Sequence, residues 1–301
     1  MRIKVILNPA SRRAISNGVL RERLGGADCA VVTTRGPGDA TEIARDAVAK
    51  SVAKLVVVGG DGTINEVANG ICGSHVPLGI IPAGGANDFA THMGIPKDVD
   101  RAFDIALNGT KKRIDAIKVN DRHFITVGGL GFGSEVALKA NAFKDNKKLG
   151  KLAYRFLGSN IYSAYAIYQI LFKPESRGGF RLRGDDLKRD VRLWNLFVGN
   201  QAVLGKNFLI HPGAANDDGL LDVCIIGEQN SKLRQFATLL VTMKGKHLAQ
   251  PYVEAYRAKR LTIDCEKRLQ FFGDGELISS SPPFNIEIVP KALHIMVPKV
   301  T

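Results

Sequence analysis

Short apolar runs alternate with amphipathic segments over the first third of the chain. Four apolar runs predict strands, and each ends in polar residues or glycine: residues 3–7, 29–33, 55–58 and 78–82. Residues 41–51 and 99–107 instead repeat apolar side chains at helical spacing. Strands that alternate with helices predict a parallel sheet with helices on both faces, which is a Rossmann-like α/β domain of residues 1–112.

The pattern changes after residue 108, where short strand-like runs become the main feature. These runs are residues 114–119, 124–129, 191–198, 220–226, 261–265, 269–272, 284–289 and 293–297. Helical patterns interrupt them at residues 148–172 and 231–244. We therefore predict a mostly antiparallel β-sandwich domain of residues 113–287, followed by a segment of about residues 288–301 that can return to the first domain.

The most informative turn is Gly-Gly-Asp-Gly-Thr at residues 59–63, directly after the third predicted strand. Glycine lets the backbone approach another molecule closely, and Thr63 with Glu66 has the spacing of a capping box. A strand, a glycine turn and a helix N-terminus together favour phosphate binding, with a plain tight turn as the alternative. Asp61 in this turn is suited to hold a magnesium-bound phosphate or to polarise a hydroxyl. The turn is not a Walker A loop, because no Gly-Lys-Ser/Thr follows, and its glycine spacing excludes a dinucleotide fingerprint.

Several polar segments follow predicted strands and should meet at one edge of the sheet. Ligands of open α/β sheets bind beyond the carboxyl ends of the strands. The segments that we expect there are Asn8, Thr34, residues 59–63 and residues 84–88.

Composition and charge narrow the class of protein. The 301 residues carry a formal net charge of +13, which favours anionic partners such as phosphorylated substrates or an acidic membrane surface. The four cysteines form no CxxC pair, so we expect neither a zinc site nor a disulfide framework, and a reducing cytosol fits best. No signal peptide or membrane span is expected, since the most apolar segment, residues 156–172, is too short. No nucleic-acid motif accompanies the charge, so no nucleic acid is expected as a partner.

Four separated motifs together resemble one family. They are residues 58–63 (Val-Gly-Gly-Asp-Gly-Thr), 82–90 (Pro-Ala-Gly-Gly-Ala-Asn-Asp-Phe-Ala), 217–222 (Asp-Asp-Gly-Leu-Leu-Asp) and 273–276 (Gly-Asp-Gly-Glu). In this order they resemble the diacylglycerol kinase catalytic-domain family, and in particular the bacterial soluble lipid kinases of the YegS/BmrU type. The first motif alone also resembles NAD kinases, whereas the set of four is much more specific.

The resemblance implies an ATP- and Mg²⁺-dependent kinase that phosphorylates a lipid hydroxyl, in diacylglycerol, phosphatidylglycerol or a related lipid. It implies Glu276 as the catalytic base, with Asp274 and Asp61 as the other catalytic residues. It implies one magnesium site formed by the Asp218 carboxylate and the carbonyls of Ala215 and Leu220. The residues implied for ATP are Asn8, Thr34, Gly59, Gly60, Asp61, Gly62, Thr63, Gly85, Asn87 and Asp88.

The chain departs from the family pattern at two positions. Gly85 stands where the family usually has a threonine, so one hydroxyl for the nucleotide is lost. Thr91 stands where an arginine is frequent, so we expect a cationic contact from Arg12, Arg13 or Arg35 instead.

Simpler interpretations remain open for several segments. Asp274-Gly275 alone is most simply a hairpin turn, and the glycines of residues 128–133 indicate close strand packing. The basic cluster of residues 144–155 is either a solvated helix end or a contact for anionic lipid headgroups. For the whole protein, the alternatives are a kinase of a soluble acceptor such as NAD, or a non-catalytic protein that binds nucleotides or polyanions. We expect a cytoplasmic protein, peripheral to the inner membrane face, and the sequence allows a homodimer.

Overall fold

The computed structural model describes residues 3–9, 11, 29–146, 160–172, 178–205 and 208–299. Arg12, Arg13 and most of the predicted basic cluster lie outside these ranges, so the structure does not test those expectations. The chain divides into two compact units, which are described separately. Unit 1 contains Met1–Ala116 and Pro290–Thr301, and unit 2 contains Ile117–Val289.

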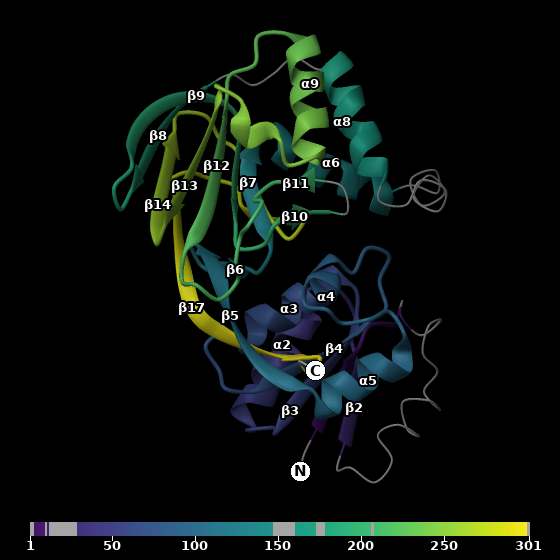
Figure 1. The fold of residues 1–301 in the computed structure, drawn as a ribbon. Helices are drawn as coiled ribbons and strands as arrows, with labels where there is room; N and C mark the ends of the chain where they lie inside the picture. Colours follow the sequence, from purple (N-terminus) through teal and green to yellow (C-terminus); the bar gives the residue numbers. More distant parts are fainter. Residues whose placement is uncertain are drawn as a thin grey trace. The chain divides into compact units, whose positions relative to one another are not determined.

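Unit 1 is built on a parallel sheet (Figure 1). Its strands lie in the order β17, β4, β3, β1, β2, and each neighbouring pair is parallel. The strands are β1 (Ile3–Leu7), β2 (Cys29–Thr33), β3 (Lys54–Gly59), β4 (Pro77–Pro82) and the last part of β17 (Phe284–Val297). Every residue of β3 is buried, as its unbroken apolar run predicts. The predicted Rossmann-like sheet is therefore confirmed.

In the described part of unit 1, four helices follow these strands. They are α2 (Asp39–Ala49), α3 (Asp61–Ile71), the short α4 (Asp88–His92) and α5 (Val99–Asn108). Helices α2 and α3 pack side by side, and α5 packs on β4. The close approach of α5 needs glycine in the strand, because a Cβ atom on Gly79 would lie 2.7 Å from the Cβ of Ala106.

The prediction of a capping box at the start of α3 is wrong. The N-cap is Gly60, and no side chain caps this helix. The Thr63 hydroxyl instead accepts a hydrogen bond from Asn8 Nδ2 at 2.8 Å. The Glu66 carboxylate turns to the neighbouring helix α2 and accepts hydrogen bonds from the backbone N–H groups of Gly38 and Ala40, at 2.9 and 3.1 Å. These N–H groups lie at the start of α2 and have no hydrogen-bond partner within that helix. They therefore stabilise the Glu66 carboxylate in this position.

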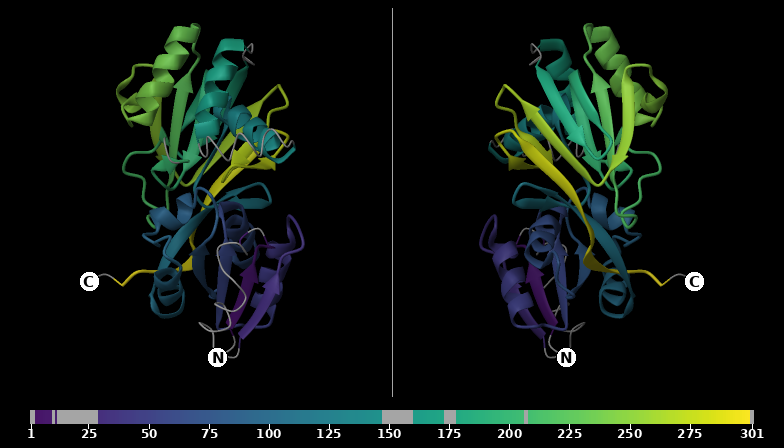
Figure 2. Two further views of the ribbon diagram at one scale, coloured as in Figure 1. Left: turned by 90° about the vertical axis from the view of Figure 1, so that its right-hand side faces the viewer. Right: turned by 90° about the vertical axis from the view of Figure 1, so that its left-hand side faces the viewer.

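Unit 2 is an antiparallel β-sandwich, as predicted (Figures 1 and 2). One sheet has the order β16, β15, β7, β9, β12, β13, and the other contains β9, β8, β14 and the first part of β17. Strand β9 belongs to both, because its first half pairs with β8 and its second half pairs with β7 and β12. The strands are β7 (Val127–Gly131), β8 (Gly179–Gly184), β9 (Lys188–Gly199), β12 (Leu221–Gly227), β13 (Val253–Ala258), β14 (Arg260–Cys265), β15 (Phe271–Gly273) and β16 (Glu276–Ser279).

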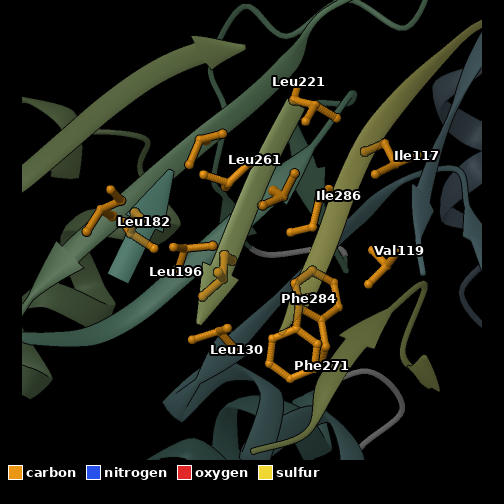
Figure 3. Close-up of a cluster of buried hydrophobic side chains, with 14 of the residues drawn as sticks. Ile117, Val119, Leu130, Leu182, Leu196, Leu221, Leu261, Phe271, Phe284 and Ile286 are labelled. Atoms are coloured by element: carbon orange, nitrogen blue, oxygen red, sulfur yellow. The ribbon is translucent and has the colours of Figure 1, made fainter. Parts of the chain in front are cut away.

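The core of unit 2 combines aliphatic and aromatic side chains from both sheets (Figure 3). The ring centroids of Phe271 and Phe284 are 5.5 Å apart, and those of Phe124 and Phe271 are 6.2 Å apart. Leu196, Leu261 and their neighbours complete this cluster. Helices α6 (Phe132–Asn146), α8 (Asn160–Phe172) and α9 (Lys232–Met243) form a smaller apolar contact among themselves.

Some elements differ from the sequence-based prediction. Residues 124–129 form not one strand but the end of β6 (Arg122–Phe124) and the start of β7. The predicted strands at 284–289 and 293–297 are one strand, β17, which joins the two units, as does β5 (Thr110–Val119). Helix α6 was not predicted. The remaining described elements are the two short strands β10 (Val203–Leu204) and β11 (Phe208–Leu209), which pair with each other, and the 3₁₀ helix η2 (His247–Ala249).

The glycines of residues 128–133 allow close strand packing, as predicted. A Cβ atom on Gly128 would lie 2.5 Å from the carbonyl oxygen of Phe272, and one on Gly131 would lie 2.5 Å from that of Trp194. In the parts of the chain that the structure describes, no helix is both long and apolar enough to cross a bilayer.

Candidate active site

The carboxyl edge of the unit 1 sheet brings together the polar segments that the sequence predicts there. The backbone N–H of Asn8 donates to Val58 O at 3.1 Å, and that of Thr34 donates to Leu7 O at 2.9 Å. The side chain of Asn8 then reaches Thr63 on the first turn of α3. The ends of β1, β2 and β3 therefore form one connected edge.

Asp61 connects the two glycine loops of this edge. It is the first residue of α3, and its carboxylate accepts hydrogen bonds from the backbone N–H groups of Asn87 and Phe89, at 2.9 and 3.2 Å. The loop after β3 is thereby fixed to the loop after β4. The carboxylate thus shapes the loops as well as contributing negative charge to the edge.

The second glycine loop, residues 83–88, closes on itself through Asn87. This buried residue has a left-handed backbone (φ 57°), and its amide exchanges two hydrogen bonds of 2.9 Å with the N–H and the C=O of Gly84. Thr91, at the position where the family frequently has arginine, donates its hydroxyl to Asn87 O at 2.8 Å. Thr91 therefore supports the loop and brings no cation.

The two glycine loops are pressed against each other. A Cβ atom on Gly84 would lie 2.5 Å from the Cα of Gly60, so neither loop has room for a side chain at this contact. The first N–H groups of α3, at Asp61, Gly62 and Thr63, have no partner within the helix. Helix N-termini with such donors are suited to bind phosphate. Gly85, the residue without the usual hydroxyl, is exposed beside this contact.

Arg35 is the one candidate cation among Arg12, Arg13 and Arg35 that the structure describes. Its exposed guanidinium pairs with Asp39 at 2.6 Å, at the start of α2. The hydrogen bond from Arg35 lowers the pKa of the Asp39 carboxyl. Arg35 is the second residue after β2 and follows Thr34 at the carboxyl edge of the sheet.

In unit 2, Asp274 and Gly275 form the two-residue turn between β15 and β16. Both have positive φ angles, 53° and 81°, and the flanking Gly273 and Glu276 are paired. The hairpin turn that the sequence suggests is thus confirmed. The Asp274 carboxylate accepts hydrogen bonds from the N–H groups of Ile125 and Thr126 at 3.0 and 2.8 Å, and from the Thr126 hydroxyl at 2.5 Å. It fixes the hairpin to the segment between β6 and β7.

These contacts predict a measurable structural effect of Asp274. We expect Asp274→Asn to lower the free energy of unfolding of unit 2 by about 1–3 kcal/mol, because backbone donors lose a charged acceptor. Asparagine tolerates the same left-handed backbone, so the substitution isolates the carboxylate. Urea unfolding, monitored by tryptophan fluorescence, measures the change in the free energy of unfolding. An unaltered midpoint would show that these hydrogen bonds contribute nothing to stability.

Glu276 is the first residue of β16 and presents a partly exposed carboxylate. Its Oε2 lies 3.6 Å from the guanidinium of Arg122, which also donates to Leu277 O at 2.5 Å. Asn141 on α6 donates to Gly275 O at 2.5 Å and accepts from the hydroxyl of Tyr162 on α8 at 2.5 Å. The sequence did not reveal Arg122, Asn141 or Tyr162, since each is an isolated polar residue without a motif.

The loop of Asp218, where the sequence predicts a metal site, contacts a cationic side chain. The Asp218 carboxylate accepts a hydrogen bond from Leu220 N at 3.1 Å and pairs with the Arg257 guanidinium, which also lies 3.4 Å from Asp222. Asp222 Oδ2 is buried and has no hydrogen-bond partner among the described residues. Burial raises the pKa of Asp222. Asp222 is a further polar residue of this segment, for which the motif alone predicts no role.

The oxygen donors of this loop suit a hard cation. Carboxylate and carbonyl oxygens are the usual ligands of Mg²⁺, and the buried Asp222 oxygen is one such donor. Among the described residues, no group of three or more acidic, histidine or cysteine side chains is arranged as a metal site. A metal at Asp218 would therefore depend on the Ala215 and Leu220 carbonyls and would displace Arg257 from the carboxylate.

The two acidic turns of unit 2 lie at the same end of one sheet. Asp222 pairs with Gly199, Gly199 pairs with Val127, and Asp274 N donates to Val127 O. Strands β12 and β15 are three spacings apart, which corresponds to about 15 Å. The Asp218 loop and the hairpin of Asp274 and Glu276 are thus neighbouring but separate features.

Comparison with protein families gives two matches that cover most of the chain. The model of the diacylglycerol kinase catalytic domain matches residues 2–119, and that of the YegS C-terminal NAD kinase beta sandwich-like domain matches residues 131–297. Together they contain every site residue that the sequence predicts, whereas Arg122 lies in the gap between the two matches.

Full-length relatives share the same span. A probable lipid kinase YegS-like protein of Pseudomonas aeruginosa is 33% identical over 96% of this chain and 91% of its own length. A similarly named protein of Chromohalobacter salexigens is 31% identical (98% and 93%), and a diacylglycerol kinase of Bacillus subtilis is 28% identical (99% and 97%).

Solved structures show that the fold is shared. A diacylglycerol kinase structure from Bacillus anthracis has a TM-score of 0.71 at 20% identity and covers 98% of this chain and 96% of its own. A second structure from the same organism has a TM-score of 0.78 at 24% identity, with 98% and 97% coverage.

Proposed function

The chain belongs to the diacylglycerol kinase catalytic-domain family, whose members are phosphotransferases that act on an alcohol group, and on this basis we propose that it is an ATP-dependent lipid kinase. The proposed reaction transfers the γ-phosphoryl group of ATP to the hydroxyl of a lipid such as diacylglycerol or phosphatidylglycerol. The names of the relatives support a lipid acceptor.

The observation that carries the proposal is the bridge that Asp61 makes between the two glycine loops of unit 1. It holds the N-terminus of α3 beside Gly84 and Gly85, at the sheet edge where α/β proteins bind ligands. The proposed ATP contacts are the N–H groups of residues 60–63, with Asn8, Thr34, Asn87 and Asp88 shaping the edge. Gly85 is exposed at this loop, and in this proposal its N–H serves as a donor in place of the missing hydroxyl.

In the proposed reaction Glu276 is the general base. It takes the proton of the lipid hydroxyl as that oxygen forms a bond to the γ-phosphorus, and the bond between the γ-phosphorus and the β–γ bridging oxygen breaks to release ADP. Asp274 fixes the hairpin that presents Glu276. When bound to the phosphates, a Mg²⁺ ion would neutralise part of their negative charge. Asp218, with the Ala215 and Leu220 carbonyls, would hold a second ion that orders the loop before β12.

The test is an acceptor screen with purified protein, γ-labelled ATP and Mg²⁺. Fractionated lipid extract and NAD are offered in parallel, and each labelled product is identified by mass; heat-denatured protein is the control. We expect label in one lipid fraction and none in NAD. Label in NAD would contradict the lipid proposal in favour of a soluble acceptor. ATP binding without turnover on any acceptor would instead support a non-catalytic nucleotide-binding protein.

A further inference from the structure

Large exposed apolar side chains are concentrated on two helices of unit 2. Among the described residues eleven such side chains are exposed, and nine of them lie on α8, on α9 or on the adjoining η2. We call these nine the α8–α9 surface; its residues are Ile167, Tyr168, Leu171, Phe172, Leu233, Phe236, Leu240, Met243 and Leu248.

The apolar residues of α9 follow the period of the helix. Leu233, Phe236, Leu240 and Met243 are three or four positions apart and form one exposed stripe. The opposite face is already buried, and its Leu239 packs against the adjoining helices. The residues that α9 buries are mostly polar, namely Gln235, Thr238 and Thr242 with Leu239, so the exposed stripe carries most of the large apolar side chains of this helix.

Helix α8 has the same division. Ala166 and Ile170 pack inward with Val136 and Leu239, whereas Tyr168 and Phe172 are exposed and their rings lie 5.4 Å apart. The sequence of this segment is compatible with a buried core helix. The structure shows instead that only one of its faces is buried.

The two exposed faces meet at one end of the helix pair. Lys232 Nζ, at the start of α9, donates to Leu171 O, near the end of α8, at 2.6 Å. The two most exposed apolar side chains, Phe172 (68%) and Leu233 (79%), follow directly after these two residues. Figure 1 shows α8 and α9 side by side.

The charges on the same helices have one sign. Residues 160–172 and 231–249 contain no aspartate or glutamate, while Lys232, Arg234, Lys244 and Lys246 are all exposed. An exposed apolar stripe with only cations beside it is the pattern of a helix that lies in a membrane interface. Each cation adds about 1 kcal/mol of attraction at an acidic bilayer.

We propose that the α8–α9 surface docks the protein on a bilayer with anionic headgroups. Phe172, Leu233 and their neighbours enter the headgroup region, and the four cations contact lipid phosphates. This inference rests on the proposed lipid kinase function, since it explains how the protein reaches an acceptor that remains in a membrane. A twofold contact between two copies fits less well, because it would bring like charges together across the interface.

The test measures binding of the full chain to sedimenting vesicles without ATP. We expect Phe172→Gln with Leu233→Gln to lower the partition coefficient on phosphatidylglycerol–phosphatidylcholine vesicles at least tenfold, because two apolar side chains no longer enter the bilayer. The matched control is Val31→Gln, an exposed apolar residue on β2 of unit 1, which should bind like the parent protein.

A second variant tests the charges independently. Arg234→Gln, Lys244→Gln and Lys246→Gln combined should weaken binding to the acidic vesicles about 100-fold and leave binding to pure phosphatidylcholine unchanged. The matched control removes three exposed cations elsewhere in unit 2, at Lys188, Lys259 and Arg268. Equal losses in this control would overturn the proposal, because net charge and not this surface would then govern binding.

Two further outcomes separate docking from catalysis. Phosphorylation of a short-chain, monomerically dispersed acceptor should be unchanged in the α8–α9 variants, while phosphorylation of vesicle lipid falls. If no lipid is phosphorylated but vesicle binding still depends on this surface, docking is supported and the kinase proposal fails. If both variants bind vesicles like the wild-type protein, the docking proposal is overturned. If these variants also change from dimer to monomer in analytical sedimentation, the surface is instead a contact between two copies of the chain.

Discussion

Replacement of Glu276 by glutamine is expected to lower the rate of phosphoryl transfer by about 10²–10⁴-fold, the usual contribution of a general base. The amide keeps the shape of the side chain but cannot take the proton of the acceptor hydroxyl. Affinity for ATP should be nearly unchanged, because the proposed ATP contacts lie in unit 1. Initial rates with a lipid acceptor and calorimetric titration with ATP measure the two effects separately.

The matched control for this variant is Glu287→Gln. Glu287 is also a partly exposed carboxylate of unit 2 with a cationic partner, Lys118, at 3.2 Å. Its loss should leave the rate unchanged. Wild-type turnover of Glu276→Gln would remove Glu276 from the proposed mechanism, and equal losses in both variants would indicate a general effect of charge on this unit.

Substitution of Asp61 by asparagine is expected to weaken ATP binding about 10- to 100-fold and to lower activity at least as much. Hydrogen bonds to a charged acceptor each contribute about 1.5–3 kcal/mol, and Asp61 accepts two from the second glycine loop. Without them the contact between Gly60 and Gly84 loosens, so the N–H donors for phosphate are less well ordered. Titration with ATP and thermal unfolding with and without ATP measure the loss.

Asp98 provides the control for Asp61. It is also an aspartate at the start of a helix in unit 1, where it accepts a hydrogen bond from Arg101 N at 2.9 Å. Asp98→Asn should bind ATP like the parent protein. If Asp61→Asn gives the same ATP titration as the parent protein, the proposed nucleotide site is in the wrong place.

The parallel sheet of unit 1 could be predicted because its signals are local. Buried strands such as β3 are unbroken apolar runs, and each ends in glycine or a polar residue. The polar residues and glycines at these strand ends also identified the sheet edge, because parallel strands bring their carboxyl ends together. The four motifs then indicated the family, although no single motif was sufficient.

The roles of individual side chains depended on distant contacts and could not be predicted in the same way. Glu66 has the spacing of a capping box, yet it contacts α2, 26 and 28 positions earlier in the chain. Asp274 binds a segment 148 positions away, and Arg257 pairs with Asp218 39 positions away. Pairings of this kind depend on tertiary structure, which no local pattern encodes.

The surface of α8 and α9 illustrates a different limit. An apolar helix segment in a sequence is most simply a core helix, because the pattern does not say how many of its faces are covered. The structure supplied that information for Phe172 and Leu233, which are exposed although their helices pack well on their other faces.

The most direct test of the central claim compares ATP labelled at the γ-phosphate with ATP labelled at the α-phosphate, using the wild-type protein, Mg²⁺ and diacylglycerol in mixed micelles. The account predicts that label from the γ-phosphate enters the organic phase as a phosphorylated lipid, at a rate that Glu276→Gln nearly abolishes, and that label from the α-phosphate stays in the aqueous phase. Label that remains aqueous in both reactions, across every lipid fraction offered as acceptor, would contradict it.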